Sequence, residues 1–312
     1  MAALINQKIN SLSEEIKALP YFVNGDCKIE RLTGGESHQC FKVTVNKNAI
    51  EKSVFVKSLT GHQQTAQAEI ASNLVAAEKG VAPAIIYYSA SWLVAEFITG
   101  NSLTDFYQQQ TGSATMNKVT VAMNLMVKTH QLTPPVNHPI LAIKKLLYRQ
   151  ASNIKLSQYQ HVALDNIIGE ITPLQTKHSN LVLCHGDVNY ENIRLSASFN
   201  AENPLEHAWL VDFECSSLAE AEYDIAMFIA INKLGIKDIN AVIHDYQQFS
   251  HAAVNEDKVR AYLACCYLIN GLWYFEAGYQ HKQAQRLIAN AHQQLILFDQ
   301  LGLLKEKITL LF

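Results

Sequence analysis

Hydrophobic positions in the first hundred residues follow two patterns, one with the period of a strand and one with that of a helix. The runs with strand character cover residues 28–32, 39–45, 53–59, 84–90 and 91–98. The first three are close enough in sequence to form an antiparallel meander. Helical patterns cover residues 1–19 and 62–80, and Gly80 ends the second of them. We therefore expect a five-stranded sheet with one helix inserted after its third strand.

Helical patterns dominate after Gly100. They cover residues 101–110, 115–131, 139–152 and 158–177, and they resume from about Leu218 to the end of the chain. Short strand-like runs interrupt them at residues 181–187, 191–195 and 207–213, and the last two can pair as a hairpin. The expected fold class is α+β with two lobes. Residues 1–99 would form a small N-terminal lobe, and residues 100–312 a larger, mostly helical C-terminal lobe.

Composition narrows the function classes. Hydrophobic residues make up 49% of the chain and charged residues 17%, a balance typical of a folded protein. The net charge is −3 and no run of Lys or Arg is present, which argues against a nucleic-acid partner. The N-terminus lacks the features of a signal peptide, and the longest apolar stretch, residues 262–275, is too short to span a bilayer. The six cysteines form no CxxC pair, so we expect a cytoplasmic protein with reduced thiols and no membrane partner.

The chemistry is concentrated around two motifs in the second half of the chain. An apolar run leads into His185-Gly186-Asp187, and Asn192 follows five positions after the aspartate. Transfer of a γ-phosphoryl group needs a carboxylate near the attacking hydroxyl and hard oxygen ligands for magnesium. Asp187 and Asn192 supply both, with the separation found in protein-kinase catalytic loops. Asp212 ends another apolar run, where a carboxylate is costly unless it meets a cation, so we expect it to be the second Mg²⁺ ligand.

The first lobe carries the residue types that bind nucleotide phosphates. Lys57 ends an apolar strand-like run, and Glu69 lies twelve residues later on the following helix. A strand lysine that holds the α- and β-phosphates, oriented by a helix glutamate, is the other part of such ATP sites. Gly34 and Gly35 lie between the first two strands, and their backbone can approach phosphates closely. The sequence therefore predicts ATP and Mg²⁺ as cofactors.

These motifs occur in the order Lys57, Glu69, HGDVNYEN and DFE. The set resembles the aminoglycoside phosphotransferase and choline kinase superfamily, relatives of the protein kinases, over roughly residues 30 to 280. The DFE triplet is typical of the choline, ethanolamine and thiamine kinase branch. The resemblance implies a protein-kinase-like fold with Asp187 as the catalytic base. It also implies that Asn192 and Asp212 are metal ligands and that Lys57 binds phosphate.

The same resemblance implies further site residues. Glu96 to Ile98 look like the linker whose backbone hydrogen-bonds adenine, and Asp224 looks like an aspartate that supports the catalytic loop. After the two glycines the family often has an Asn, and this chain departs from that pattern with Ser37 and His38. Ser37 is the residue of this segment that we assign to the nucleotide site.

The acceptor is indicated by a predicted helix over residues 259–279. It carries Trp273 and Tyr274 and is similar to the aromatic segment that encloses the quaternary ammonium group in choline kinases. An aromatic face attracts a cation, and Glu214 could add a carboxylate that faces the same cation. We therefore predict a small-molecule alcohol acceptor that carries a positive charge, either choline-like or thiamine-like.

Other functions are possible for the same motifs. An aminoglycoside-type antibiotic phosphotransferase would need a more acidic and less aromatic acceptor site. A protein kinase is disfavoured because residues 216–226 leave little room for an activation loop and contain no APE-like segment. A non-catalytic, nucleotide-binding pseudokinase is disfavoured because Asp187, Asn192, Asp212 and Lys57 are all present. The sequence leaves the oligomeric state and the choice between choline and thiamine open.

Overall fold

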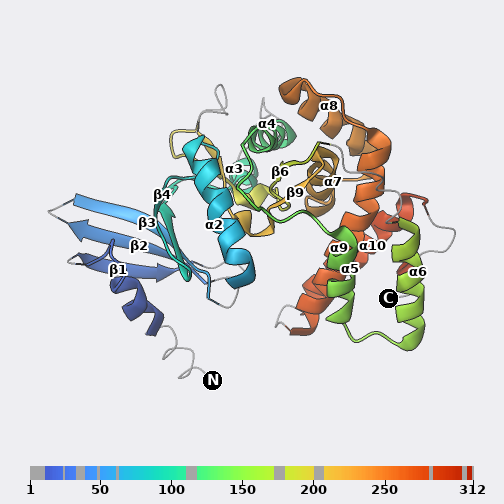
Figure 1. The fold of residues 1–312 in the computed structure, drawn as a ribbon, viewed down its shortest axis with the longest axis horizontal. Helices are drawn as coiled ribbons and strands as arrows, with labels where there is room; N and C mark the ends of the chain where they lie inside the picture. The colour runs from blue at the N-terminus through green and yellow to red at the C-terminus, as the bar shows by residue number, and fades with distance from the viewer. Residues whose placement is uncertain are drawn as a thin grey trace.

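The computed structural model has two lobes, a small sheet-containing lobe and a larger helical one (Figure 1). This architecture confirms the expected α+β, protein-kinase-like fold class. The described residues are 11–23, 25–32, 39–47, 50–60, 63–109, 118–171, 180–199, 207–280, 284–303 and 308–310.

The small lobe contains the predicted five-stranded antiparallel sheet. Its strands are β1 (Asp26–Arg31), β2 (Cys40–Lys47), β3 (Ile50–Ser58), β4 (Ile85–Tyr88) and β5 (Trp92–Glu96). They are arranged in the order β1-β2-β3-β5-β4, so the first three form the expected meander. The predicted helix after the third strand is α2 (Gln63–Glu78). The first helix, expected to reach residue 19, ends at Lys17 within the described part of the chain.

Both faces of this sheet are covered. Alternating residues of β2 and β3, among them Val43 and Val54, pack against Ile16 from the N-terminal helix. On the opposite face, Leu93 packs against Ile70 of α2. The burial of both faces fixes α2 to the sheet, and Glu69 of α2 is consequently held close to β3.

The large lobe is built around one long, buried helix, α9 (Glu256–Gln280), which packs against α7 and α10 (Figure 1). The remaining helices are α3 (Leu103–Gln109), α4 (Lys118–His130), α5 (Ile143–Ser152), α6 (Gln158–Ile171), α7 (Ala221–Ile231), α8 (Ile239–Ser250) and α10 (Ala284–Gln300). No helix in these described segments is long and apolar enough to cross a membrane.

Two short antiparallel strand pairs lie within the helical lobe. β7 (Ile193–Leu195) pairs with β8 (Ala208–Leu210), which confirms the expected hairpin. β6 (Val182–Cys184) pairs with β9 (Ser217–Ala219), and this pairing was not predicted. The expectation that helix resumes at Leu218 is therefore wrong, because α7 begins only at Ala221.

The backbone contacts of Leu218 explain why the helix begins later than expected. Its amide donates to the carbonyl of Pro139, and its carbonyl accepts from the amide of Leu141. Leu218 thus lies between β6 and a second extended segment, and both its N–H and its carbonyl group are hydrogen-bonded to that segment. The same contact explains why the helix expected over residues 139–152 begins only at Ile143.

The two lobes are joined after β5. A Cβ atom on Gly100 would lie 1.8 Å from the carbonyl oxygen of Leu195, so only glycine fits where the chain crosses β7. The guanidinium of Arg194 donates to the carbonyl of Gly100 over 2.7 Å. The crossing is therefore anchored to the large lobe, while the division into residues 1–99 and 100–312 stays a prediction.

Candidate active site

The loop that follows β6 depends on a glycine. Gly186 has a φ of +75°, and a Cβ atom there would lie 2.5 Å from the carbonyl oxygen of Cys215. A larger residue would both strain the backbone and separate the two segments. Gly186 therefore allows the loop with Asp187 to lie directly against the turn η3 (Phe213–Cys215), which Asp212 precedes.

Asp187 is held by two asparagine side chains. Its Oδ2 atom accepts a hydrogen bond from Asn192 Nδ2 at 2.8 Å, and its Oδ1 atom accepts one from Asn189 Nδ2 at 3.0 Å. The Oδ1 atom of Asn189 accepts from the amide of Asn192 and so caps the turn η2 (Tyr190–Asn192). The structure thus brings Asp187 and Asn192 together. Because Asn192 directs its NH₂ group to Asp187, its carbonyl oxygen is the atom suited to a cation.

Lys57 is the centre of an ionic group that includes both lobes. Its Nζ atom lies 2.6 Å from Glu69 Oε1, 2.6 Å from Asp212 Oδ1 and 3.2 Å from Glu214 Oε2. The side chains of Lys57 and Glu69 are almost completely buried, whereas that of Asp212 is 36% exposed. We call these four residues the Lys57 group.

The Lys57 group has more negative than positive charge, since three carboxylates surround one ammonium. Burial by itself would lower the pKa of Lys57, but the carboxylates of Asp212, Glu69 and Glu214 outweigh it and hold that pKa well above its ordinary value. Burial, together with the charge of Asp212, raises the pKa of Asp187 to about 8. Hard carboxylate and amide oxygens with surplus negative charge are the donors that Mg²⁺ prefers, so these residues fit the expected ion.

Asp224 supports the loop that follows β6. Its Oδ1 atom accepts the amide of Gly186 at 2.8 Å, and its Oδ2 atom accepts the amide of His185 at 2.9 Å. His130 of α4 donates to the same Oδ2 atom at 3.1 Å, and the hydroxyl of Tyr246 lies 2.8 Å from the other ring nitrogen of His130. Asp224 therefore has the position in which the family resemblance placed it.

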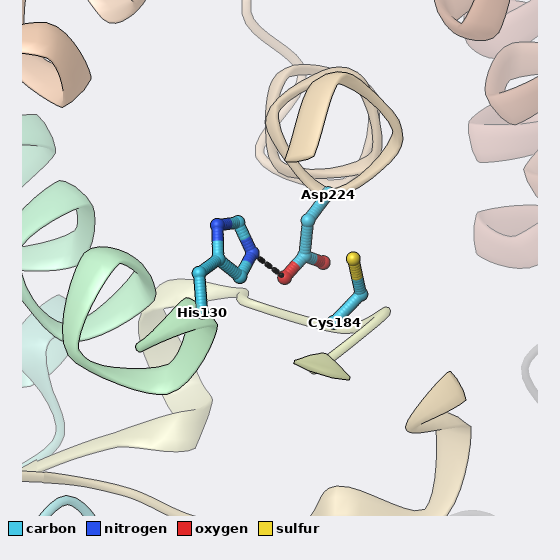
Figure 2. A group of neighbouring side chains, drawn as sticks. All are labelled: His130, Cys184 and Asp224. Atoms are coloured by element: carbon cyan, nitrogen blue, oxygen red, sulfur yellow. Dashed lines mark hydrogen bonds and ion pairs between the residues drawn. The ribbon is translucent and has the colours of Figure 1, made fainter. Parts of the chain in front are cut away.

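Figure 2 shows that His130, Cys184 and Asp224 point toward one another, and their ligand atoms all lie within 4.8 Å. Such a trio could bind a metal ion, but its polar atoms are already engaged. Both oxygens of Asp224 accept hydrogen bonds, and the Cys184 thiol donates to the carbonyl of Glu220. Burial also raises the pKa of Cys184 well above its ordinary value, which opposes a metal-binding thiolate. These hydrogen bonds make the trio a support for the loop, and we call its three residues the Asp224 brace.

His185 links the two halves of the site through its ring. Its Nε2 atom lies 3.1 Å from the carbonyl oxygen of Val211, and its Nδ1 atom accepts the amide of Asp187 at 3.2 Å. Burial lowers the pKa of His185, so the ring is neutral and can donate on one side and accept on the other. His185 is thus a structural residue of the loop.

The other predicted site residues have fewer contacts. Glu96 ends β5 and its amide donates to Ala84, while Ile98 lies two residues further along the linker. Gly34, Gly35 and Ser37 lie outside the described residues. The half-buried rings of Trp273 and Tyr274 contact each other edge to face, with centroids 5.1 Å apart. Their role in acceptor binding stays a prediction.

Sequence reasoning missed several residues that shape the site. Asn189 could have been found, because an Asn three positions before the end of a short turn is a typical cap. His130 and Tyr246 lie on separate helices, 94 and 22 residues away in sequence from Asp224, and no local pattern connects them to it.

Comparison with known proteins identifies the class of the molecule. A choline/ethanolamine kinase family protein from Mesorhizobium loti has a TM-score of 0.65 with 18% identity, over 96% of this chain and 95% of that one. Choline kinase LicA from Streptococcus pneumoniae has a TM-score of 0.65 with 16% identity, over 93% and 99%. Spectinomycin phosphotransferase has a TM-score of 0.55 with 12% identity, over 93% of both chains. The fold is therefore that of the kinase-like phosphotransferases.

Comparison of the sequence with family models shows which family the chain belongs to. The model of the choline/ethanolamine kinase family matches residues 29–301, most of the chain. The chain belongs to this family and is accordingly a small-molecule kinase with an alcohol group as acceptor. A comparison with curated protein sequences found no match.

Proposed function

We propose that the protein transfers the γ-phosphoryl group of ATP to the hydroxyl of a small cationic alcohol, choline-like or thiamine-like. The observation that carries this proposal is the Lys57 group, which lies beside the hydrogen-bonded pair of Asp187 and Asn192. One lobe supplies a buried ammonium for phosphate, and the other supplies a carboxylate for the acceptor hydroxyl. The solved complex of the similar choline kinase LicA with AMP supports a nucleotide in this fold.

Each residue then has a defined role. The ammonium of Lys57, oriented by Glu69, binds the α- and β-phosphates of ATP. The Asp187 carboxylate orients the acceptor hydroxyl and takes its proton as the new oxygen–phosphorus bond forms and the bond from Pγ to the β-phosphate oxygen breaks. Asn189 and Asn192 keep the carboxylate of Asp187 in place.

Asn192 and Asp212 are the residues that would hold Mg²⁺. Bound Mg²⁺ would neutralise the charge of the phosphates and the charge that Asp212 exerts on Asp187. Glu214 also belongs to the Lys57 group, at 3.2 Å from its ammonium, so we propose that this carboxylate contributes on the phosphate side as well as to the acceptor.

The cationic acceptor is supported by charge and by the aromatic pair. The site has more carboxylates than cations, and Trp273 and Tyr274 provide aromatic surface on α9, the central helix of the large lobe. An aromatic face and a nearby carboxylate together favour a quaternary ammonium or a thiazolium over a neutral sugar. We also propose that the backbone of Glu96 and Ile98 binds adenine, and that Gly34, Gly35 and Ser37 contact the phosphates.

A panel assay tests the acceptor. The purified protein is incubated with MgATP and, separately, with choline, ethanolamine, thiamine or an aminoglycoside, and ADP formation is measured. We expect turnover with choline or thiamine and none in the Asp187→Asn variant. Turnover with the aminoglycoside alone would indicate an antibiotic phosphotransferase. Nucleotide binding without any turnover would indicate a pseudokinase.

A further inference from the structure

Three buried polar side chains meet where α2 of the small lobe contacts the large lobe. Ser72 lies on α2, Ser216 follows the turn η3, and His138 belongs to the segment between α4 and α5. Their exposed fractions are 0%, 6% and 6%. We call these three residues the serine junction. None of them belongs to the Lys57 group or to the Asp224 brace.

The contacts of the serine junction are uncharged, and the one between the two serines is the shorter. The hydroxyl oxygens of Ser72 and Ser216 are 2.9 Å apart, and His138 Nε2 lies 3.5 Å from the hydroxyl oxygen of Ser72. Burial lowers the pKa of His138, with a smaller opposing effect from the backbone of Ser216, so the ring is neutral at neutral pH. A buried hydroxyl pair of this kind is costly to leave half-satisfied, because the remaining hydroxyl loses its partner without regaining water.

The serine junction joins the same two segments as the Lys57 group, at a second point. Ser72 is three residues after Glu69 and so lies on the same face of α2. Ser216 is four residues after Asp212 and two after Glu214. Packing on the sheet sets the position of α2 within the small lobe, and the contact with Ser216 adds a second point that ties α2 to the large lobe. The position of Glu69 and Lys57 relative to Asp212 therefore depends on both the Lys57 group and the serine junction.

The large-lobe side of the junction is anchored. Leu218, two residues after Ser216, pairs with Pro139 and Leu141 through two backbone hydrogen bonds. Ser216 and His138 therefore belong to one strand-paired unit of the large lobe. The hydroxyl of Ser72 ties α2 to that unit, in addition to the packing of α2 on its own sheet.

We propose that Ser72, Ser216 and His138 are positioning residues that align Lys57 and Glu69 with Asp212 before a nucleotide binds. This inference rests on the proposed function, because the nucleotide phosphates are the ligand of Lys57. Without the junction, nucleotide binding must itself restore the orientation of α2. The affinity for nucleotide therefore depends on the junction, and the affinity for the acceptor does not.

The test compares Ser72→Ala and Ser216→Ala with Ser217→Ala. Ser217 is the matched control: it is next to Ser216, is 8% exposed, and its hydroxyl has no hydrogen-bond partner among the described residues. MgADP affinity is measured by calorimetry, and KM is measured for ATP and for the acceptor identified in the panel. Loss of one net hydrogen bond corresponds to roughly five-fold weaker nucleotide binding. We expect that loss in both junction variants, an unchanged acceptor KM, and an unaffected Ser217→Ala protein.

Two further variants test whether Ser72 and Ser216 act through the same hydroxyl contact. The double variant Ser72→Ala/Ser216→Ala should bind MgADP about as well as either single variant, because both remove the same contact. Ser72→Thr, which keeps the hydroxyl, should restore most of the affinity. Additive losses in the double variant, or an equal rise in KM for ATP and acceptor, would contradict a positioning role.

Hydrogen exchange of α2 tests the junction without any nucleotide. In the ligand-free protein we expect faster amide exchange across α2 in Ser72→Ala and Ser216→Ala than in Ser217→Ala. Unchanged exchange in α2 would overturn this inference even if MgADP binds. A wild-type protein that binds neither MgATP nor MgADP would instead contradict the proposed function, so the two failures are distinguishable.

Discussion

Lys57 and Asp224 each lie at the centre of a buried group of ionisable side chains, but the two groups balance their charges differently. In the Lys57 group one ammonium meets three carboxylates, and the side chain of Asp212 is 36% exposed. Asp224 is a single carboxylate with no exposed surface, and it accepts two backbone amides and the ring of His130. The first group has surplus negative charge and one partly exposed carboxylate, whereas the carboxylate of the second is fully buried and has its hydrogen bonds made within the protein.

This difference in charge balance distinguishes a group that can bind a ligand from a group that only stabilises the fold. A buried carboxylate whose oxygens all accept hydrogen bonds gains nothing from a further ligand, so Asp224 contributes to stability and to the shape of the loop. Carboxylates that outnumber their cation gain from an additional positive charge. Removing a charge from the Lys57 group should therefore reduce activity more than stability, and removing one from the Asp224 brace should do the reverse.

The largest expected effect is on turnover. Asp212→Asn should lower kcat by about a thousand-fold, since it removes a charge that acts on the transferring phosphoryl group. Lys57 keeps Glu69 and Glu214 as partners, so the thermal midpoint measured by circular dichroism should change little. A variant with wild-type kcat would show that Asp212 is not part of the chemistry.

The next effect is on stability. Asp224→Asn keeps the shape of the side chain but turns an NH₂ group toward backbone amides, which should cost about 3 kcal/mol in the free energy of urea unfolding. Glu256→Gln is the control, because Glu256 pairs with Arg260 on the surface and should cost less than about 0.5 kcal/mol. Equal losses in the two variants would remove the distinction between brace and surface pair.

Ligand binding should stabilise only an intact Lys57 group. At a free concentration of MgADP one hundred times its Kd, the wild-type protein should gain about 2.7 kcal/mol, seen as a rise in the unfolding midpoint. Chelation of Mg²⁺ with EDTA should remove most of this gain, and Asp212→Asn should not show it. Stabilisation of that variant by MgADP to the same extent would contradict the assignment of Asp212 as a metal ligand.

The smallest expected effect is on the pH dependence of stability, and it concerns the serine junction. This junction is uncharged at neutral pH and is a third buried group to compare with the Lys57 group and the Asp224 brace. The folded-state pKa of His138 is lowered from 6.5, so the unfolded chain binds the proton more readily. Stability should be complete above about pH 6.5 and should decrease as the pH falls below it. His138→Gln should reduce the slope of the unfolding free energy against pH, measured by urea unfolding between pH 5 and 7. His185 is also buried with a lowered pKa, so part of the slope should remain in that variant. An unchanged slope in that variant would show that His138 is not responsible.

Much of the fold could be predicted from the sequence because local residue patterns determine it. Alternating residues predicted the five strands, and the spacing of Lys57 and Glu69 predicted a contact that the structure shows at 2.6 Å. The hairpin of β7 and β8 followed from two nearby apolar runs. For the catalytic loop, the residue types and the separation of Asp187 and Asn192 were sufficient to predict their proximity.

The parts of the fold and of the site that could not be predicted depend on contacts between segments that are far apart in the sequence. Leu218 was expected in a helix because its neighbours are helix formers, but β6 and Pro139 determine its conformation. Ser72 is 66 residues from His138 and 144 from Ser216, so no window of sequence shows that they meet. Tertiary packing decides such positions, and local propensity does not.

The backbone of Asp212 has a consequence for how this protein can evolve. Its φ of 70° is in the left-handed region, which costs most residues with a Cβ atom roughly 1–2 kcal/mol relative to glycine and which aspartate tolerates better than most. Asp212→Gly would fit this backbone more easily, but it would remove the carboxylate that lies 2.6 Å from the ammonium of Lys57. The substitution that most eases the backbone at position 212 is therefore also one that removes the proposed metal ligand.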